Sequence, residues 1–321
     1  MPSPLLIDSH VHLPSSSTSE SPSLAEYHTT TTTSSSSSSL HPLAGVILIG
    51  SDHPNDDEPL RELASMSQAA AAATASSAPK VLALVPSAPF LSGPAKLEEY
   101  LAQAEKEAGS EAWKRVRGFR YLLRGGDKAA RGAALEEELV EGLKLLGRKG
   151  FVVEVALERG GRAQLEEVVE MVGRAHEGVA EGEEVVFVLD HLGKPDLTVI
   201  NQADPSFLAW RSAMFTLGKS TKTYLKLSGC FSELPERLKS RSAEDIFSAI
   251  LQWLAVVVAA FGPRRLMFGS DWPLCADGVG DDAWGKWHRV VEMVCDLAGL
   301  SEEDQAMLWG GTAKEAYGLD C

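Results

Sequence analysis

The stretch FVVEVALERGGRAQLEEVVEMVGRAHEG, residues 151–178, contains a strand-like run followed by a helix-like one. The first part is short, apolar and rich in Val, and the second is amphipathic and ends at Gly178. Short apolar runs are typical of buried strands, and a Gly directly after an amphipathic segment is a common helix end. This stretch therefore predicts one strand-and-helix unit.

The same unit recurs along the chain. Apolar runs that resemble strands begin at residues 5, 45, 81, 116, 151, 185, 224 and 265, at intervals of 34 to 41 residues. Helix-like segments lie between them, for example at residues 94–109 and 135–150. This α/β pattern predicts a (β/α)8 TIM barrel. An open doubly wound sheet is the alternative, but no G-x-G-x-x-G follows the first run.

Two segments depart from the regular pattern. Residues 301–318 predict an extra C-terminal helix, with Ser301 as its N-cap. Residues 14–42 form a low-complexity stretch with five consecutive Thr and six consecutive Ser, which predicts a mobile loop after the first strand. Whether this loop is a lid, a substrate loop or an inert insertion stays open. No linker divides the chain, so residues 1–321 are predicted to form a single domain.

Composition limits the partners and the compartment. A formal net charge of −15 argues against nucleic acid, because phosphate binding needs clustered Lys and Arg. The N-terminus shows no basic stretch followed by a long apolar segment, so we expect no signal peptide. The most apolar run ends at Gly262 and Pro263 and is too short to span a membrane, so we expect a buried helix in that run. The four Cys show no C-x-x-C spacing, which favours a reducing, cytoplasmic compartment. Nothing in the sequence indicates an oligomeric state.

Polar residues collect where the predicted strands end. His10 and His12 end the first strand, His191 the sixth and Asp271 the eighth. In a TIM barrel the chemistry belongs to the C-terminal ends of the strands, so these residues are expected to meet. Strand alternation places Asp8 on the same face as the histidine pair, as a supporting residue. By the same rule Asp190, next to His191, is expected to point into the helix layer and is left out of the catalytic set.

The residues that end these strands lie in segments that resemble a known family. IDSHVHL (7–13), VRGFRYLLR (116–124), VLDHLGKPDL (188–197) and RLMFGSDWPLC (265–275) are similar to the amidohydrolase superfamily, in its amidohydrolase-related branch of sugar-acid lactonases. Residues 204–217, DPSFLAWRSAMFTL, resemble the fungal L-rhamnono-1,4-lactonases of that branch. The resemblance covers nearly the whole chain and implies a barrel of the metal-dependent-hydrolase type.

The resemblance also implies roles for individual residues. Asp271 matches the acid that activates water, and His191 matches a catalytic histidine. Arg120 matches an arginine that binds the oxygen atoms of the substrate. Lys194 and Trp272 are expected to contact substrate as well.

The cofactor stays open. Binuclear members of the family that this chain resembles need a bridging Lys on the fourth strand and a His on the fifth. Here these strands read VRGFRYLL and FVVEVAL and contain neither, which argues against a binuclear centre. One divalent metal, Zn or Mn, held by His10, His12 and Asp271 with Glu154 or His191, is one hypothesis. A metal-independent site is the other.

The leading functional prediction is a hydrolase of carbohydrate metabolism that opens a small sugar-acid lactone, L-rhamnono-1,4-lactone or a similar compound, by attack of water on the ester carbonyl. One alternative is non-oxidative decarboxylation of an aromatic or unsaturated acid on the same kind of barrel. Another is a degraded member without catalytic activity. The joint presence of His10, His12, His191 and Asp271 argues against the last.

Overall fold

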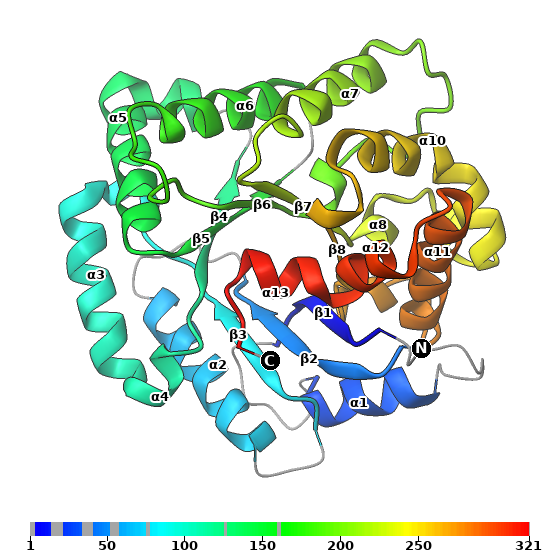
Figure 1. Ribbon diagram of the computed structural model, residues 1–321, viewed down its shortest axis with the longest axis horizontal. Helices are drawn as coiled ribbons and strands as arrows, with labels where there is room; N and C mark the ends of the chain where they lie inside the picture. The colour runs from blue at the N-terminus through cyan, green and yellow to red at the C-terminus, as the bar shows by residue number, and fades with distance from the viewer. Residues whose placement is uncertain are drawn as a thin grey trace.

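The computed structural model describes residues 4–13, 22–33, 41–51, 58–74, 78–124, 127–158 and 162–320. Parallel strands form an inner ring, and helices surround it (Figure 1). The strands are β1 (Leu6–Val11), β2 (Leu43–Ile49), β3 (Val81–Val85), β4 (Gly118–Leu123), β5 (Val152–Leu157), β6 (Phe187–Leu189), β7 (Thr223–Leu227) and β8 (Leu266–Phe268). All eight predicted strands are present.

The pairing of the strands closes the ring. Ladders join β1 through β3 and β4 through β8. Single parallel bridges complete the circle, from Leu84 to Val116 and Ser87 to Arg120 on one side and from Val11 to Trp272 on the other. The predicted (β/α)8 barrel is confirmed.

Helices follow the strands as the sequence pattern predicts. The longer ones are α1 (Leu24–Thr33), α2 (Glu58–Thr74), α3 (Gly93–Ala108), α5 (Asp127–Arg148), α6 (Arg162–His176), α7 (Pro205–Leu217), α10 (Ala243–Phe261) and α11 (Ala283–Leu297). Short helices are α4 (Ser110–Trp113), α8 (Cys230–Glu233) and α9 (Glu236–Lys239). In the described part of the chain, α10 alone is long and apolar enough to cross a membrane. It packs against α7 and α11 and buries Ile250, Trp253 and Val257, as the core helix predicted there should.

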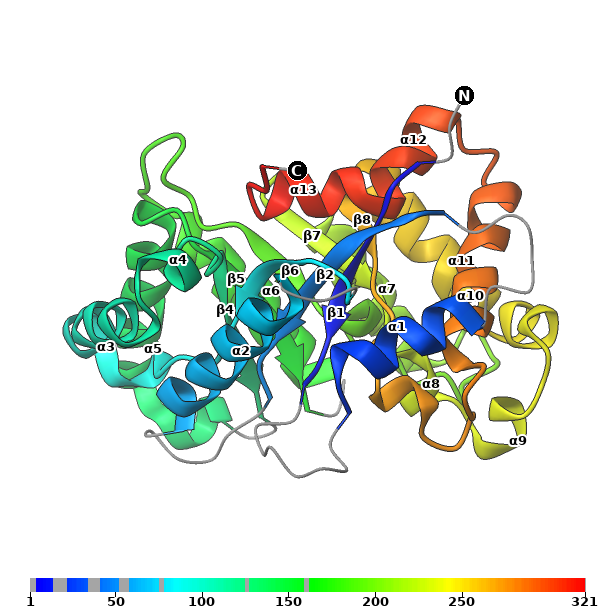
Figure 2. The same ribbon diagram turned by 90° about the horizontal axis from the view of Figure 1, so that it is seen from below.

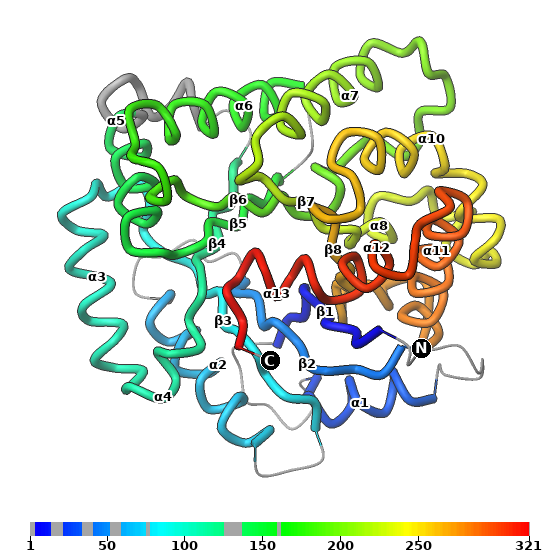
Figure 3. Tube along the Cα trace, in the orientation of Figure 1, coloured from blue at the N-terminus to red at the C-terminus, as the bar shows by residue number. Residues whose placement is uncertain are grey.

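The C-terminal segment closes one end of the barrel. It consists of α12 (Glu302–Ala306), a π-helical turn (Met307–Gly311) and α13 (Thr312–Ala316), and Ser301 caps it as predicted, accepting from the backbone NH of Asp304. Figure 2 places α12 and α13 at the end opposite to α8 and α9, and Figure 3 shows α13 passing across the centre of the ring of strands. Ala313, Tyr317 and Leu319 pack on the apolar side chains inside the barrel.

The low-complexity segment contains a helix that the sequence analysis did not predict. Residues 24–33 form α1, so the prediction of a mobile loop is wrong for them; residues 14–21 and 34–40 of the segment lie outside the described residues. Leu24, Tyr27 and Thr31 share one face of α1 and are buried. Three side chains at this helical spacing give α1 a face to pack, although half of its residues are Thr.

Candidate active site

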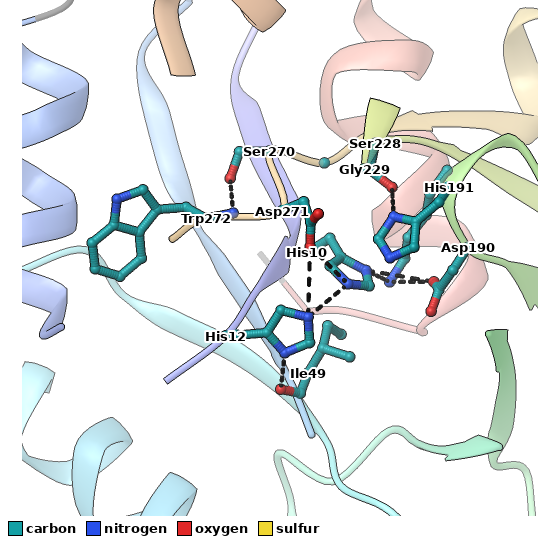
Figure 4. Close-up of polar contacts among 12 residues, drawn as sticks. His10, His12, Ile49, Asp190, His191, Ser228, Gly229, Ser270, Asp271 and Trp272 are labelled. Atoms are coloured by element: carbon teal, nitrogen blue, oxygen red, sulfur yellow. Dashed lines mark hydrogen bonds and ion pairs between the residues drawn. The ribbon is translucent and has the colours of Figure 1, made fainter. Parts of the chain in front are cut away.

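Polar side chains at the ends of three strands meet at the C-terminal end of the barrel (Figure 4). β1 contributes His10 and the following His12, the turn after β6 contributes His191, and the turn after β8 contributes Asp271. His12, His191 and Asp271 line a cavity of about 1020 Å³, and His10 is fully buried next to them. The structure therefore brings together the four residues on which the predicted site depends.

An irregularity in β1 aims the two histidines into the barrel. Between Asp8 and Val11 the chain advances three residues while the paired strand β2 advances two, from Val46 to Leu48. One extra residue in a strand is a β-bulge, and it breaks the alternation of side chains. As a result Asp8 points to the helix layer, and the prediction that it shares a face with His10 is wrong.

Asp8 nevertheless supports the site from behind. Its Oδ1 accepts from the backbone NH groups of His10 (3.2 Å) and Ser270 (2.8 Å). Its Oδ2 accepts from the Tyr27 hydroxyl (2.7 Å) and from Nε1 of Trp284 (3.2 Å). Four donors hold this fully buried carboxylate, although burial still raises its pKa. Asp8 thereby fastens β1 to the turn that carries Asp271.

The ligand atoms of the His-x-His pair and of Asp271 converge. Nε2 of His10 lies 3.0 Å from Nε2 of His12, and Oδ1 of Asp271 lies 3.7 Å from both. Asp271 adopts a left-handed backbone conformation, φ +64°, and its NH donates to the His10 carbonyl at 2.9 Å. Among the described residues, the buried Oδ1 of Asp271 has no hydrogen-bond partner.

The turn after β6 brings Asp190 and His191 to the same place. His191 and Leu192 have φ values of +53° and +55°, so strand alternation stops after β6. His191 packs against His10 with ring centroids 4.5 Å apart, and its Nδ1 lies 3.0 Å from Ser228 Oγ. Asp190 faces the barrel interior, where Oδ1 lies 3.4 Å from His10 Nδ1 and Oδ2 lies 3.4 Å from Arg120 Nε. The prediction that Asp190 points into the helix layer is wrong.

Burial determines the charge of these groups. Burial lowers the pKa of His12 and of His191 to about 3, and it lowers the pKa of His10 well below its ordinary value. The positive charge of Lys226 lowers the pKa of His10 further, and that of Arg120 lowers the pKa of His12 further. Burial also raises the pKa of Asp271 from 3.8 to about 8. The imidazoles are therefore neutral at neutral pH, which is the form that binds metals.

The donor set fits a divalent cation. The candidate ligand atoms of His10, His12 and Asp271 all lie within 4.8 Å of one another, and so do those of His10, Asp190 and His191. Neutral imidazoles with a carboxylate are typical ligands of zinc. The unpartnered Oδ1 of Asp271 is the atom that a cation would satisfy.

Glu154, one of the two residues expected to complete the ligand set, is held elsewhere. Its Oε2 lies 2.6 Å from Nζ of Lys226, and its Oε1 accepts from the hydroxyl of Tyr317. Glu154 therefore belongs to neither group of candidate ligands. His191 belongs to the group with His10 and Asp190, and not to the group with His12 and Asp271 that it was expected to complete.

The cavity wall carries two of the three residues predicted to contact substrate. Arg120 lines it and donates through Nη1 to the Gly50 carbonyl at 2.8 Å. Lys194 lines it with Nζ 3.1 Å from the carbonyl oxygen of Glu158 and 3.5 Å from Oε1 of Glu233. Trp272 does not line it: the side chain packs edge-on against Tyr27 at 5.5 Å, so the geometry does not support substrate contact.

Two further cations of the wall, Arg124 and Lys239, were not predicted. Arg124 directly follows β4, so its place at a strand end was a usable signal. Lys239 ends α9, and no motif marks it.

Comparisons with known proteins agree with this geometry. The sequence profile of the family described as Amidohydrolase matches residues 7–319. An L-rhamnono-gamma-lactonase of Scheffersomyces stipitis is 29% identical over 74% of this chain and 69% of its own, and an L-fucono-1,5-lactonase of Burkholderia multivorans is 34% identical over 64% of each. A crystal structure of a Burkholderia multivorans amidohydrolase with bound zinc superposes with a TM-score of 0.72 at 25% identity, covering 98% of this chain and 99% of that one. The chain belongs to the amidohydrolase family.

Proposed function

We propose that this protein hydrolyses the lactone of a sugar acid, with L-rhamnono-1,4-lactone or a similar compound as substrate. The observation that carries the proposal is the placement of Asp271 beside His10 and His12, where Asp271 and His12 line a cavity together with Arg and Lys side chains. Two relatives that bear lactonase names support the choice of substrate class.

The residues of the site supply the steps that ester hydrolysis needs. In its ionised form, Asp271 takes a proton from water as the water oxygen attacks the lactone carbonyl, and it returns that proton to the ring oxygen when the ring C–O bond breaks. His191 lines the same cavity as this carboxylate and donates to the carbonyl oxygen as negative charge develops there. The product is the open-chain hydroxy acid.

A divalent cation, Zn or Mn, would be held by His10, His12 and Asp271, and when bound it would polarise the carbonyl and favour ionised Asp271. Arg120 and Lys194 orient the hydroxyl-bearing chain. Arg120 does so as a planar fork and Lys194 as a point charge, so the two read different features of the substrate.

A substrate panel tests this proposal. The purified protein is stripped of metal and divided into three portions, one left metal-free, one supplemented with Zn and one supplemented with Mn. Each portion is offered 1,4- and 1,5-aldonolactones while a pH indicator follows acid release. We expect release from at least one 6-deoxysugar lactone. Release that needs Zn or Mn shows metal dependence, and equal release in all portions shows a metal-independent site. Carbon dioxide release from an aromatic acid, without lactone opening, would instead identify a decarboxylase, and inactivity in both assays a non-catalytic member.

A further inference from the structure

The carbonyl oxygen of Ile49 fixes the position of the proton on neutral His12. Nδ1 of His12 lies 3.0 Å from the carbonyl oxygen of Ile49, and a carbonyl only accepts. Nδ1 of neutral His12 therefore carries the proton, and its Nε2 carries the lone pair. Since Nε2 of His10 lies 3.0 Å from this lone pair, a hydrogen bond between the rings requires the proton on Nε2 of His10.

Lys226 completes this chain at its other end. With its proton on Nε2, His10 has a lone pair on Nδ1, and Nζ of Lys226 lies 3.1 Å away as a donor. Every hydrogen bond from Lys226 through His10 and His12 to the Ile49 carbonyl is then satisfied. This is one of two tautomers that the surroundings of His10 allow.

Cation binding needs the other tautomer. Nε2 of His10 can bind a cation only through its lone pair, which moves the proton to Nδ1. In that form Nδ1 needs an acceptor, and Oδ1 of Asp190 lies 3.4 Å away. Lys226 and Asp190 thus face the same nitrogen of His10, and each suits one tautomer.

Lys226 cannot swing away from His10 easily. It is fully buried, its Nζ lies 2.6 Å from Oε2 of Glu154 and 3.5 Å from Oδ1 of Asp190, and Glu154 is held in turn by Tyr317. Tyr317 follows α13, so the C-terminal segment supports this lysine from the closed end of the barrel.

We propose that Lys226 and Asp190 are positioning residues that decide which nitrogen of His10 carries the proton, and thereby how tightly His10, His12 and Asp271 hold a divalent cation. Lys226 favours the tautomer that bonds to His12, and Asp190 favours the tautomer that binds a cation. The inference concerns the same site as the proposed function and rests on it to that extent. It does not depend on which lactone is the substrate.

The first test reads the tautomer directly in the wild-type protein. Nitrogen-15 NMR of the histidine side chains, with His10 assigned by comparison with His10→Asn, is recorded on metal-free protein and after Zn²⁺ addition. We expect the His10 proton on Nε2 without metal and on Nδ1 with Zn²⁺. A proton already on Nδ1 in the metal-free protein would overturn the proposal, and this measurement needs no lactonase activity.

The second test measures Zn²⁺ affinity by competition with a chelator. Lys226→Met alone would leave Glu154 as an uncompensated buried charge, so Lys226→Met is combined with Glu154→Gln and compared with Glu154→Gln alone. We expect the double variant to bind Zn²⁺ at least about tenfold more tightly than that control, and Asp190→Asn to bind about 10–100-fold more weakly than wild type. Unchanged affinity in both comparisons would overturn the proposal; if the double variant does not fold, the tautomer measurement decides.

Discussion

The hydroxyl of Tyr27 donates to Oδ2 of Asp8 over 2.7 Å and joins the Thr-rich helix α1 to the strand that carries the histidine pair. Both residues are fully buried. Asp8 in turn accepts from the backbone NH groups of His10 and Ser270, so Tyr27 acts on the site through a carboxylate that fastens β1 to the turn after β8.

Tyr27→Phe should therefore destabilise the protein by about 1–3 kcal/mol, because a buried acceptor loses one of its donors. Urea denaturation followed by tryptophan fluorescence measures the difference. Tyr224→Phe is the matched control: it removes a hydroxyl that donates to Glu315 at 3.2 Å in a partly buried place, and should cost about 0.5–1 kcal/mol. Equal losses of unfolding free energy in the two variants would show that the hydrogen bond to Asp8 contributes no more to stability than a partly buried one.

Gly229→Ala should remove most of the activity. Gly229 has φ +63°, and a Cβ there would lie 2.1 Å from Nδ1 of His191, so the imidazole has to move. Gly178→Ala is the control, because its φ of +70° carries the same backbone strain while a Cβ there has nothing within 4 Å. We expect Gly178→Ala to lose about 1–2 kcal/mol of stability from backbone strain and Gly229→Ala to lose more because of the collision, but only Gly229→Ala to lose about 10²-fold in kcat. Similar kcat values would argue against a catalytic role for His191.

The positions of the strands could be predicted from the sequence because each is a short apolar run between turn residues. The meeting of His10, His12, His191 and Asp271 followed from the barrel, which gathers all strand ends at one mouth. What failed was the direction of single side chains. The bulge in β1 turned Asp8 outward, and the left-handed turn at His191 left Asp190 inside, and neither departure shows in the periodicity of the sequence.

Tyr27 was missed for a different reason. It stands beside a run of Thr whose composition predicts no packed structure, and only its spacing from Leu24 and Thr31 indicates a buried face. Lys226 was not predicted as part of the site, because its contacts with His10 and Glu154 join residues 216 and 72 positions apart and have no local signal.

His288 should make stability fall in acid. It is buried between the rings of Trp284 and Trp309, and burial lowers its pKa from 6.5 to about 3. Below pH 6.5 the unfolded chain binds a proton at this residue and the folded chain does not, so stability is lost as the pH falls from about 6.5 toward 3, by up to about 1.4 kcal/mol per pH unit.

His288→Phe keeps an aromatic ring in this stack and removes the titrating group. The difference in unfolding free energy between wild type and His288→Phe, measured by urea denaturation at several pH values, should shift in favour of the variant as the pH falls from 7 to 4. Using the difference cancels the contributions of His10, His12 and His191, whose pKa values are lowered in the same direction. A difference that does not change with pH would mean that His288 takes up its proton in the folded protein.

Asp271→Asn should abolish most turnover while the fold is kept. The residue has φ +64°, a left-handed conformation that Asn also tolerates, and its backbone NH still bonds to the His10 carbonyl. The amide cannot take a proton from water, so kcat for the best lactone should fall by about 10²–10⁴-fold with unchanged thermal stability. Asp296→Asn, at an exposed position of α11, is the matched control and should retain wild-type kcat. If Asp271→Asn turned over lactone within a few fold of that control, another group would have to activate the water.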